Sequence, residues 1–118
     1  MPMTDRYDEN LMPCIEMCTD CHQACLRTIP YCLQKGGPHA QFEHIRLLED
    51  CVQICQTSAD FMLRSSDLHT ITCGACAEIC DRCADDCMRM PDPHMEACGE
   101  VCRKCAEMCR QMAHQMSH

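Results

Sequence analysis

The chain has 118 residues, the length of one small domain, and 16 of them are cysteine. Its formal net charge of −8 argues against nucleic-acid binding, because nucleic-acid-binding domains present a basic surface. Large core-forming side chains are scarce, with 2 Phe, 2 Tyr and no Trp, whereas Cys, Met and His occupy 34 positions. No apolar run reaches the roughly 18 residues that a membrane-spanning helix needs.

The first ten residues lack the charged and then apolar pattern of a secretory signal. We therefore expect a cytoplasmic protein, in which thiols stay reduced. A reduced cysteine-rich chain favours a metal site over a disulfide scaffold.

Turn signals divide the chain at a Gly-Gly-Pro break (36–38), a polar Ser-Ser-Asp linker (65–67) and a Met-Pro-Asp-Pro turn (90–93). No segment alternates with a period of two, so strands are not expected. The sequence predicts an all-α, up-down-up-down four-helix bundle, one domain over residues 1–118. Its expected helices cover about 9–35, 40–65, 68–90 and 93–116.

Two prolines bear on these boundaries. Asp92 and Pro93 are suited to the N-cap and first position of the last helix. Pro30 lies deep inside the first helix and should kink it or end it early.

The cysteines follow a helical period in each segment. In the first segment they are separated by four, three, four and seven residues, and the second segment has only two, four apart. The third segment steps by three, four, three and four, and the fourth by four, three and four. Such steps place each set on one helix face, at the seam positions of a bundle. The set is Cys14, Cys18, Cys21, Cys25, Cys32, Cys51, Cys55, Cys73, Cys76, Cys80, Cys83, Cys87, Cys98, Cys102, Cys105 and Cys109.

A seam of cysteines needs a reason, because cysteine is much smaller than leucine. Such a seam should leave a narrow hollow tube, and an unfilled tube forfeits packing contacts. One or two buried cysteines can act as small apolar residues, but sixteen at seam positions are hard to explain in that way. Disulfides require Cβ atoms about 3.8 Å apart, whereas i,i+4 pairs on a helix lie about 5–6 Å apart.

The spacing and the charge balance favour copper(I) as the metal. Ferredoxin clusters use C-x2-C-x2-C, which this chain lacks. Zinc with four thiolates keeps a charge of −2, which is costly when repeated in a dry core. Cu(I) prefers thiolates, and equal numbers of bridging thiolates and Cu(I) ions cancel in charge. Seven C-x3-C pairs in phase offer two-coordinate sites.

This array of C-x3-C and C-x2-C on four predicted helices resembles the cytosolic branch of the bacterial copper storage protein family. The resemblance covers Cys14 to Cys109 and implies a homotetramer of four-helix bundles that each store many Cu(I) ions on their cysteines. Cytosolic members can place a further ligand seven residues before the C-x3-C of the second helix. His44 has that spacing from Cys51, so the resemblance adds His44 to the ligands.

The second helix otherwise departs from the dense pattern, since its remaining seam positions hold Leu48, Ser58 and Met62. We expect Leu48 to be an apolar plug. Met17 and Met108 flank seam cysteines and are expected to be packing residues. His22 is expected on the solvated face, and His114 and His118 in a frayed tail.

Soft neutral ligands gather at both ends of the expected bundle. One end would collect His44, Met90, His94 and Met95, and we expect copper to enter there because Met and His bind Cu(I) more weakly than thiolates. The opposite end is more apolar and would hold Leu11, Met62, His69, Met112 and Met116.

The sequence thus predicts a non-enzymatic store or buffer of Cu(I) in the cytoplasm, without nucleic-acid or membrane partners. It has no Ser/His/Asp arrangement and no glycine-rich phosphate loop. Two alternatives stay open. One is general sequestration of Zn(II), Cd(II) or Ag(I). The other is a thiol redox protein, which would need an exposed cysteine with a lowered pKa.

Overall fold

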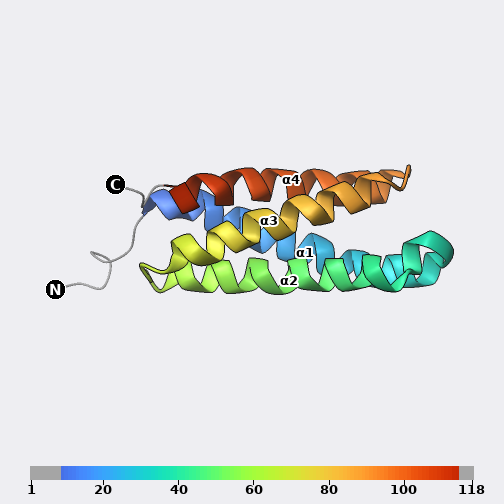
Figure 1. Cartoon of the computed structure of the whole chain (residues 1–118), viewed down its shortest axis with the longest axis horizontal. Helices are drawn as coiled ribbons and strands as arrows, with labels where there is room; N and C mark the ends of the chain where they lie inside the picture. The colour runs from blue at the N-terminus through green and yellow to red at the C-terminus, as the bar shows by residue number, and fades with distance from the viewer. Residues whose placement is uncertain (1–8, 115–118) are drawn as a thin grey trace.

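The computed structural model describes residues 9–114, and within that range the chain is helical and has no strand. Four long helices run up, down, up and down the molecule (Figure 1). The predicted all-α four-helix bundle is therefore confirmed. In chain order the elements are the 3-10 helix η2 (Glu9–Leu11), α1 (Met12–Lys35), the 3-10 helix η3 (Gly37–Ala40), α2 (Phe42–Leu63), α3 (His69–Met88) and α4 (Pro93–His114).

Each helix packs against its neighbours in the chain, and α4 also packs against α1. Helices α1 and α3 are thus diagonal to each other, as are α2 and α4. This arrangement turns the cysteine-bearing face of every helix toward one common axis.

Helix α1 does not end at Pro30, contrary to one of the two outcomes expected of that residue. It continues to Lys35 and stops at Gly36, whose φ of 73° is in the left-handed region that favours glycine. Pro30 is exposed, and the carbonyl that it leaves without an intrahelical partner belongs to Leu26, which is 49% exposed. Water can solvate that carbonyl, so the helix tolerates the proline and brings Cys32 into the core.

The turns differ in how they cap the helices that follow. The Oδ1 of Asp92 accepts the backbone N–H of Met95 at 2.9 Å, as predicted for an N-cap of α4. Before α3, no side-chain hydrogen bond caps the helix, although the Oγ of Ser66 accepts the N–H of Leu68 at 3.1 Å. The start of α4 is therefore capped by a side chain, whereas the start of α3 is not.

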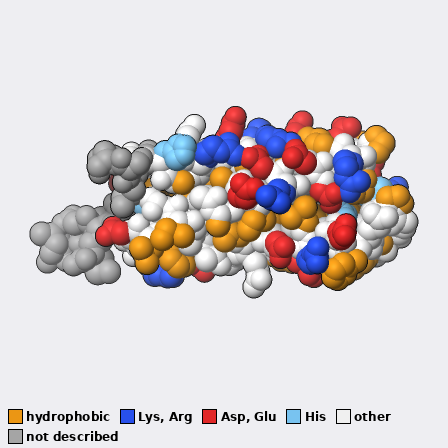
Figure 2. Space-filling view, in the orientation of Figure 1, with side chains coloured by type: hydrophobic (Ala, Val, Ile, Leu, Met, Phe, Trp, Pro, Cys, Tyr) orange, Lys and Arg blue, Asp and Glu red, His pale blue; other side chains and the backbone are white. Residues whose placement is uncertain are grey.

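The core is built mainly from sulfur-containing side chains, with alanine and a few aliphatic residues beside them. Charged side chains of both signs cover the outer face, with apolar side chains between them (Figure 2). None of the helices in residues 9–114 has an apolar stretch that could cross a membrane.

Removal of the Asp92 cap tests its contribution to stability. Asp92→Ala should lower the free energy of unfolding by about 1 kcal/mol, because the Met95 N–H loses its partner. Chemical denaturation of the apo protein measures this change. Asp67→Ala, in the exposed α2–α3 turn, is the matched control and should change stability little. Equal losses in the two variants would contradict the assignment of Asp92 as a cap.

Candidate metal centre

All sixteen cysteines lie in the core as free thiols, and none is more than 3% exposed. The seam positions of α2 that lack cysteine also face inward, since His44, Leu48, Ser58 and Met62 are each at most 2% exposed. Every predicted seam position named above is thus buried, including Cys32 beyond Pro30.

The thiols lie in groups that could each hold a metal ion. Within each group all sulfur atoms lie within 4.8 Å of one another. Three groups have four cysteines and one has three, and every group draws on at least three helices. The groups are Cys14, Cys73 and Cys109; Cys18, Cys76, Cys105 and Cys109; Cys21, Cys55, Cys80 and Cys105; and Cys21, Cys25, Cys51 and Cys102.

Shared sulfur atoms join these groups into one continuous array. Cys109 belongs to the first two groups, Cys105 to the second and third, and Cys21 to the third and fourth. A thiolate that lies in two groups can bridge two ions. The arrangement is therefore a chain of linked sites along the bundle axis rather than a set of isolated ones.

Sulfur atoms from facing helices contact one another across the seam. Examples are Cys18 with Cys109 at 3.5 Å, Cys51 with Cys80 at 3.6 Å and Cys25 with Cys102 at 3.5 Å. The sulfurs therefore fill the axis in these layers, and the expectation of a hollow tube there is wrong. Small side chains at all four helices allow this close approach.

These sulfur distances suit a soft metal ion. A metal–thiolate bond of about 2.3 Å gives S···S distances of about 3.8 Å around a tetrahedral ion and about 4.0 Å around a trigonal one. A linear two-coordinate ion requires about 4.6 Å, so neighbouring sulfurs would have to separate slightly. The geometry thus accepts three or four thiolates at an ion without rearrangement.

A different ligand set surrounds Cys32 at one end of the array. The Sγ of Cys32 lies 3.4 Å from the Nε2 of His44 and 3.7 Å from the Sδ of Met95. The Nδ1–H of His44 donates to the Oδ2 of Asp86 at 2.5 Å. Because a carboxylate only accepts, Nδ1 carries the ring proton, and the lone pair of Nε2 faces Cys32. This is how a metal-binding histidine is usually oriented.

The opposite end of the array is closed by other neutral groups. Cys73 lies 3.8 Å from both the Sδ of Met62 and the Oγ of Ser58. Leu11 and Met112 are also buried in the core cluster. His69 does not join them, because its Nδ1–H donates to the carbonyl of Ser66 at 2.8 Å. Met116 and His118 lie outside the described residues.

The four residues expected at the entrance do not form one ring. His44 and Met95 contact Cys32, and Met90 is buried nearby in the core cluster. His94 is exposed and lies between α1 and α4, where its Nε2 is 3.2 Å from the hydroxyl of Thr28 and its ring stacks on Tyr31 at 4.0 Å.

His22 was also placed wrongly by the sequence pattern. It is half-buried, and its Nδ1–H donates to the carbonyl of Val52 at 3.0 Å, so it joins α1 to α2. Met17 and Met108 are half-buried against the core cluster, and His114 is exposed at the end of α4.

Sequence reasoning missed Asp86 and Thr28. Asp86 orients His44 and is itself hydrogen-bonded by Arg89, but its position on the third helix gave no signal because many exposed carboxylates look alike. Thr28 is 1% exposed and occupies a seam position, three residues after Cys25 and four before Cys32. The separation of seven residues between those cysteines could have indicated that the residue between them also faces the core.

The electrostatics of the Cys32 end follow from burial and from these contacts. Burial raises the pKa of the Cys32 thiol to about 11, with smaller contributions from the charges of Cys98 and Asp92. Burial also acts to raise the pKa of Asp86, but hydrogen bonds from Arg89 and His44 hold it below its ordinary value. The thiol is thus neutral and Asp86 ionised near neutral pH.

The raised pKa of Cys32 predicts a pH dependence of apo stability. Between the ordinary thiol pKa of about 8.5 and about 11, Cys32 ionises in the unfolded chain but not in the folded one. The unfolded state then binds fewer protons, so stability falls as pH rises. Over this range the apo Cys32→Ser variant should lose less stability than the unmodified apo protein, as measured by denaturation at each pH. Identical slopes would contradict the neutral, buried thiol.

Known proteins are similar to this chain in sequence, and two solved structures share its fold. A protein from Nitrosospira multiformis is similar to this chain, with 48% identity and a TM-score of 0.85 over 90% of this chain and 96% of that one. The Cu(I)-bound copper storage protein BsCsp3 is 36% identical to this chain, with a TM-score of 0.82. The match covers 87% of this chain and 97% of BsCsp3. An uncharacterized cysteine-rich protein of Bacillus subtilis, YhjQ, is 37% identical over 75 residues, which are 64% of this chain and 67% of its own.

The model of the copper storage protein family matches residues 7–114, which is nearly the whole chain and includes all sixteen cysteines. The chain belongs to the copper storage protein family.

Proposed function

We propose that this protein stores Cu(I) in the bundle core, with the sixteen cysteines and His44 as ligands. The observation that carries the proposal is the linkage of the cysteine groups through Cys21, Cys105 and Cys109. Bridging thiolates bind many monovalent ions in one array, whereas isolated sites would bind a few. The likeness to Cu(I)-bound BsCsp3 supports the same metal.

Charge favours Cu(I) over the divalent alternative. Twelve cysteines make up the four groups, and four Zn(II) ions would leave four uncompensated negative charges in a dry core. With Cu(I), one ion can be added for each thiolate, so that the loaded array is neutral. Cd(II) has the same charge problem as Zn(II), and Ag(I) remains a chemical mimic of Cu(I).

The protein acts as a store and not as an enzyme. Every cysteine is buried, and thiolate bridging occupies the coordination positions of each ion, so no open position is left for a substrate. A thiol redox function would need an exposed cysteine with a lowered pKa, whereas every cysteine is buried. Storage would take place in the cytoplasm and in a homotetramer, as the resemblance to the cytosolic branch implies.

Copper titration tests the storage function directly. The reduced protein should bind on the order of 16 Cu(I) ions per chain under anaerobic conditions, because each thiolate can bridge. The measurement is competition with a chromophoric Cu(I) chelator, with Zn(II) binding measured in parallel. Saturation at three or four equivalents of Cu(I) would refute the storage proposal and favour isolated four-thiolate sites.

We also propose that copper enters at the end that holds Cys32, His44 and Met95. His44 and Met95 are neutral ligands directly against a thiol, so they can receive an ion and pass it inward without trapping it. Met90 is buried at the same end of the bundle, and the exposed His94 lies to one side.

Loading kinetics distinguish the two ends. The double variant His44→Leu and Met95→Leu should load more slowly from a Cu(I) complex in stopped flow, with total capacity reduced by no more than the sites at Cys32. Met62→Leu and Met112→Leu, at the opposite end, form the matched control and should load at the unmodified rate. Slowing only in the control pair would move the entrance to that end.

A further inference from the structure

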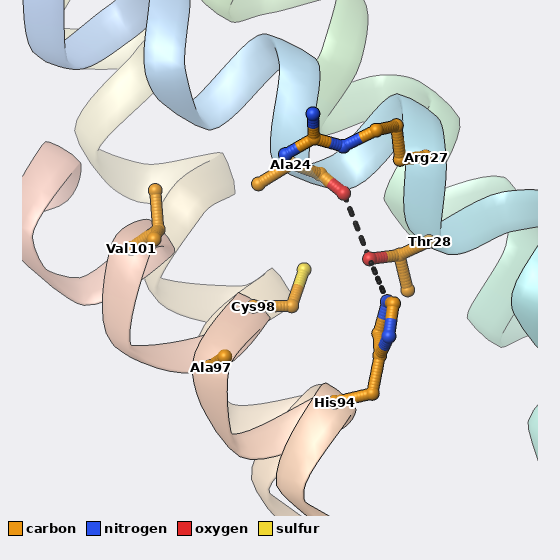
Figure 3. Close-up of a pocket in the computed structure, with 7 residues that line it drawn as sticks. All are labelled: Ala24, Arg27, Thr28, His94, Ala97, Cys98 and Val101. Carbon is orange, nitrogen blue, oxygen red and sulfur yellow. Dashed lines mark hydrogen bonds between the residues drawn. The ribbon is translucent and has the colours of Figure 1, made fainter.

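A surface pocket opens between α1 and α4, beside the array rather than at either end (Figure 3). It has a volume of about 220 Å³ and is lined by Ala24, Arg27 and Thr28 from α1 and by His94, Ala97, Cys98 and Val101 from α4. Small side chains on both helices, Ala24 and Ala97, leave it open. Its lining includes Cys98, whose sulfur contacts that of Cys25 in the array.

Cys98 is the most accessible cysteine of the protein. It is 3% exposed, whereas every other cysteine is at most 1% exposed. Its side chain points from α4 toward α1 in Figure 3. Its sulfur lies 3.9 Å from that of Cys25, which belongs to one of the four cysteine groups.

Thr28 interrupts the row of cysteines on α1 beside Cys98. It takes a seam position that would otherwise hold a cysteine, and its hydroxyl donates to the carbonyl of Ala24 at 2.7 Å. The Nε2 of His94 lies 3.2 Å from the same hydroxyl. Because Thr28 interrupts the cysteine row of α1 between Cys25 and Cys32, α1 supplies Cys98 with the sulfur of Cys25 but with none at the Thr28 position.

Arg27 gives the pocket a positive charge that no carboxylate of the described residues pairs with. Among residues 9–114 it is the one arginine that makes neither an ion pair nor a contact with an aromatic ring. In Figure 3 its guanidinium lies over the pocket beside Ala24. On a protein with a net charge of −8, a free cation at this place selects for an anionic group.

The geometry points to a docking site for a low-molecular-weight thiol that carries a carboxylate, through which Cu(I) leaves the store at Cys98. The inference rests on the proposed storage of Cu(I). The carboxylate pairs with Arg27, and the thiol reaches the ion on Cys98. A pocket of this volume admits the thiol end of such a molecule, while its remainder stays in solvent.

The step is a ligand exchange without oxidation or reduction. The Cu(I)–sulfur bond to Cys98 breaks as a bond from Cu(I) to the incoming sulfur forms. The remaining bond to a bridging thiolate, which stays bound to a neighbouring ion, breaks as Cu(I) leaves with the incoming thiolate. The proton of the incoming thiol passes to the Cys98 thiolate, so that the protein regains a neutral thiol. Charge in the core is unchanged, which keeps the exchange compatible with burial.

Release kinetics of the copper-loaded protein test the proposal. Glutathione, an anionic thiol, should release Cu(I) to a chromophoric chelator faster than the neutral 2-mercaptoethanol at equal thiolate concentration. Arg27→Gln should slow release by glutathione about two- to fivefold, the factor that an exposed ion pair provides, and leave release by 2-mercaptoethanol unchanged. Arg82→Gln, an exposed arginine on the diagonal helix α3, is the control and should behave as the unmodified protein. Equal release rates in the two variants would overturn the role of Arg27.

A second variant tests the pocket itself. Ala97→Leu should fill it and slow release by both thiols, with the copper capacity unchanged. A variant of full capacity that releases copper at the unmodified rate would overturn the pocket as the route. Copper capacity is measured for every variant, so a failure of storage itself is distinguished from a failure of this route.

Limited alkylation of the apo protein gives a test that needs no metal. Iodoacetate, an anionic reagent, should modify Cys98 before any other cysteine, as peptide mass mapping would show. Arg27→Gln should slow this reaction but not the reaction with the neutral iodoacetamide. First modification at another cysteine would overturn the assignment of Cys98 as the most accessible cysteine.

Discussion

The contact of sulfur with sulfur along the bundle axis is the constraint on which the rest of the structure depends. Cysteine is small enough for four helices to bring their seam atoms to within 3.5–4.0 Å of one another. Leucine at the same positions would hold the helices farther apart and leave no ligand atom. The same small side chain thus closes the core and supplies the binding groups.

That constraint explains how the two ends differ from the middle. One of the four groups takes a cysteine from every helix, and α2 supplies just two cysteines, Cys51 and Cys55. Beyond them the seam of α2 holds His44 and Leu48 on one side and Ser58 and Met62 on the other. Neutral ligands therefore limit the array in both directions, and only His44 is held in place by a carboxylate, that of Asp86.

Much of the fold and of the site could be predicted from the sequence. The spacing of the cysteines predicts which face of each helix is buried, and therefore that these faces meet at a common axis. The Gly36 stop and the Asp92 cap are local signals, and the structure confirms both. The places of His22 and His94 depend on what the neighbouring helix offers, a carbonyl of Val52 and the ring of Tyr31. The residue spacing within one segment cannot predict such contacts between helices.

The charge of the core links storage to protons. Burial opposes the ionisation of a thiol, as it does at Cys32, so burial favours neutral thiols in an unloaded array. Each Cu(I) that enters displaces a thiol proton, so one positive charge replaces another and the core stays neutral throughout loading. A divalent ion that replaced a single proton would add a positive charge to the core. If it replaced two protons, fewer ions would fit for the same number of thiolates. The linkage of the groups through shared cysteines therefore selects for a monovalent soft ion, and the release of that ion by an incoming thiol simply runs the same exchange in reverse.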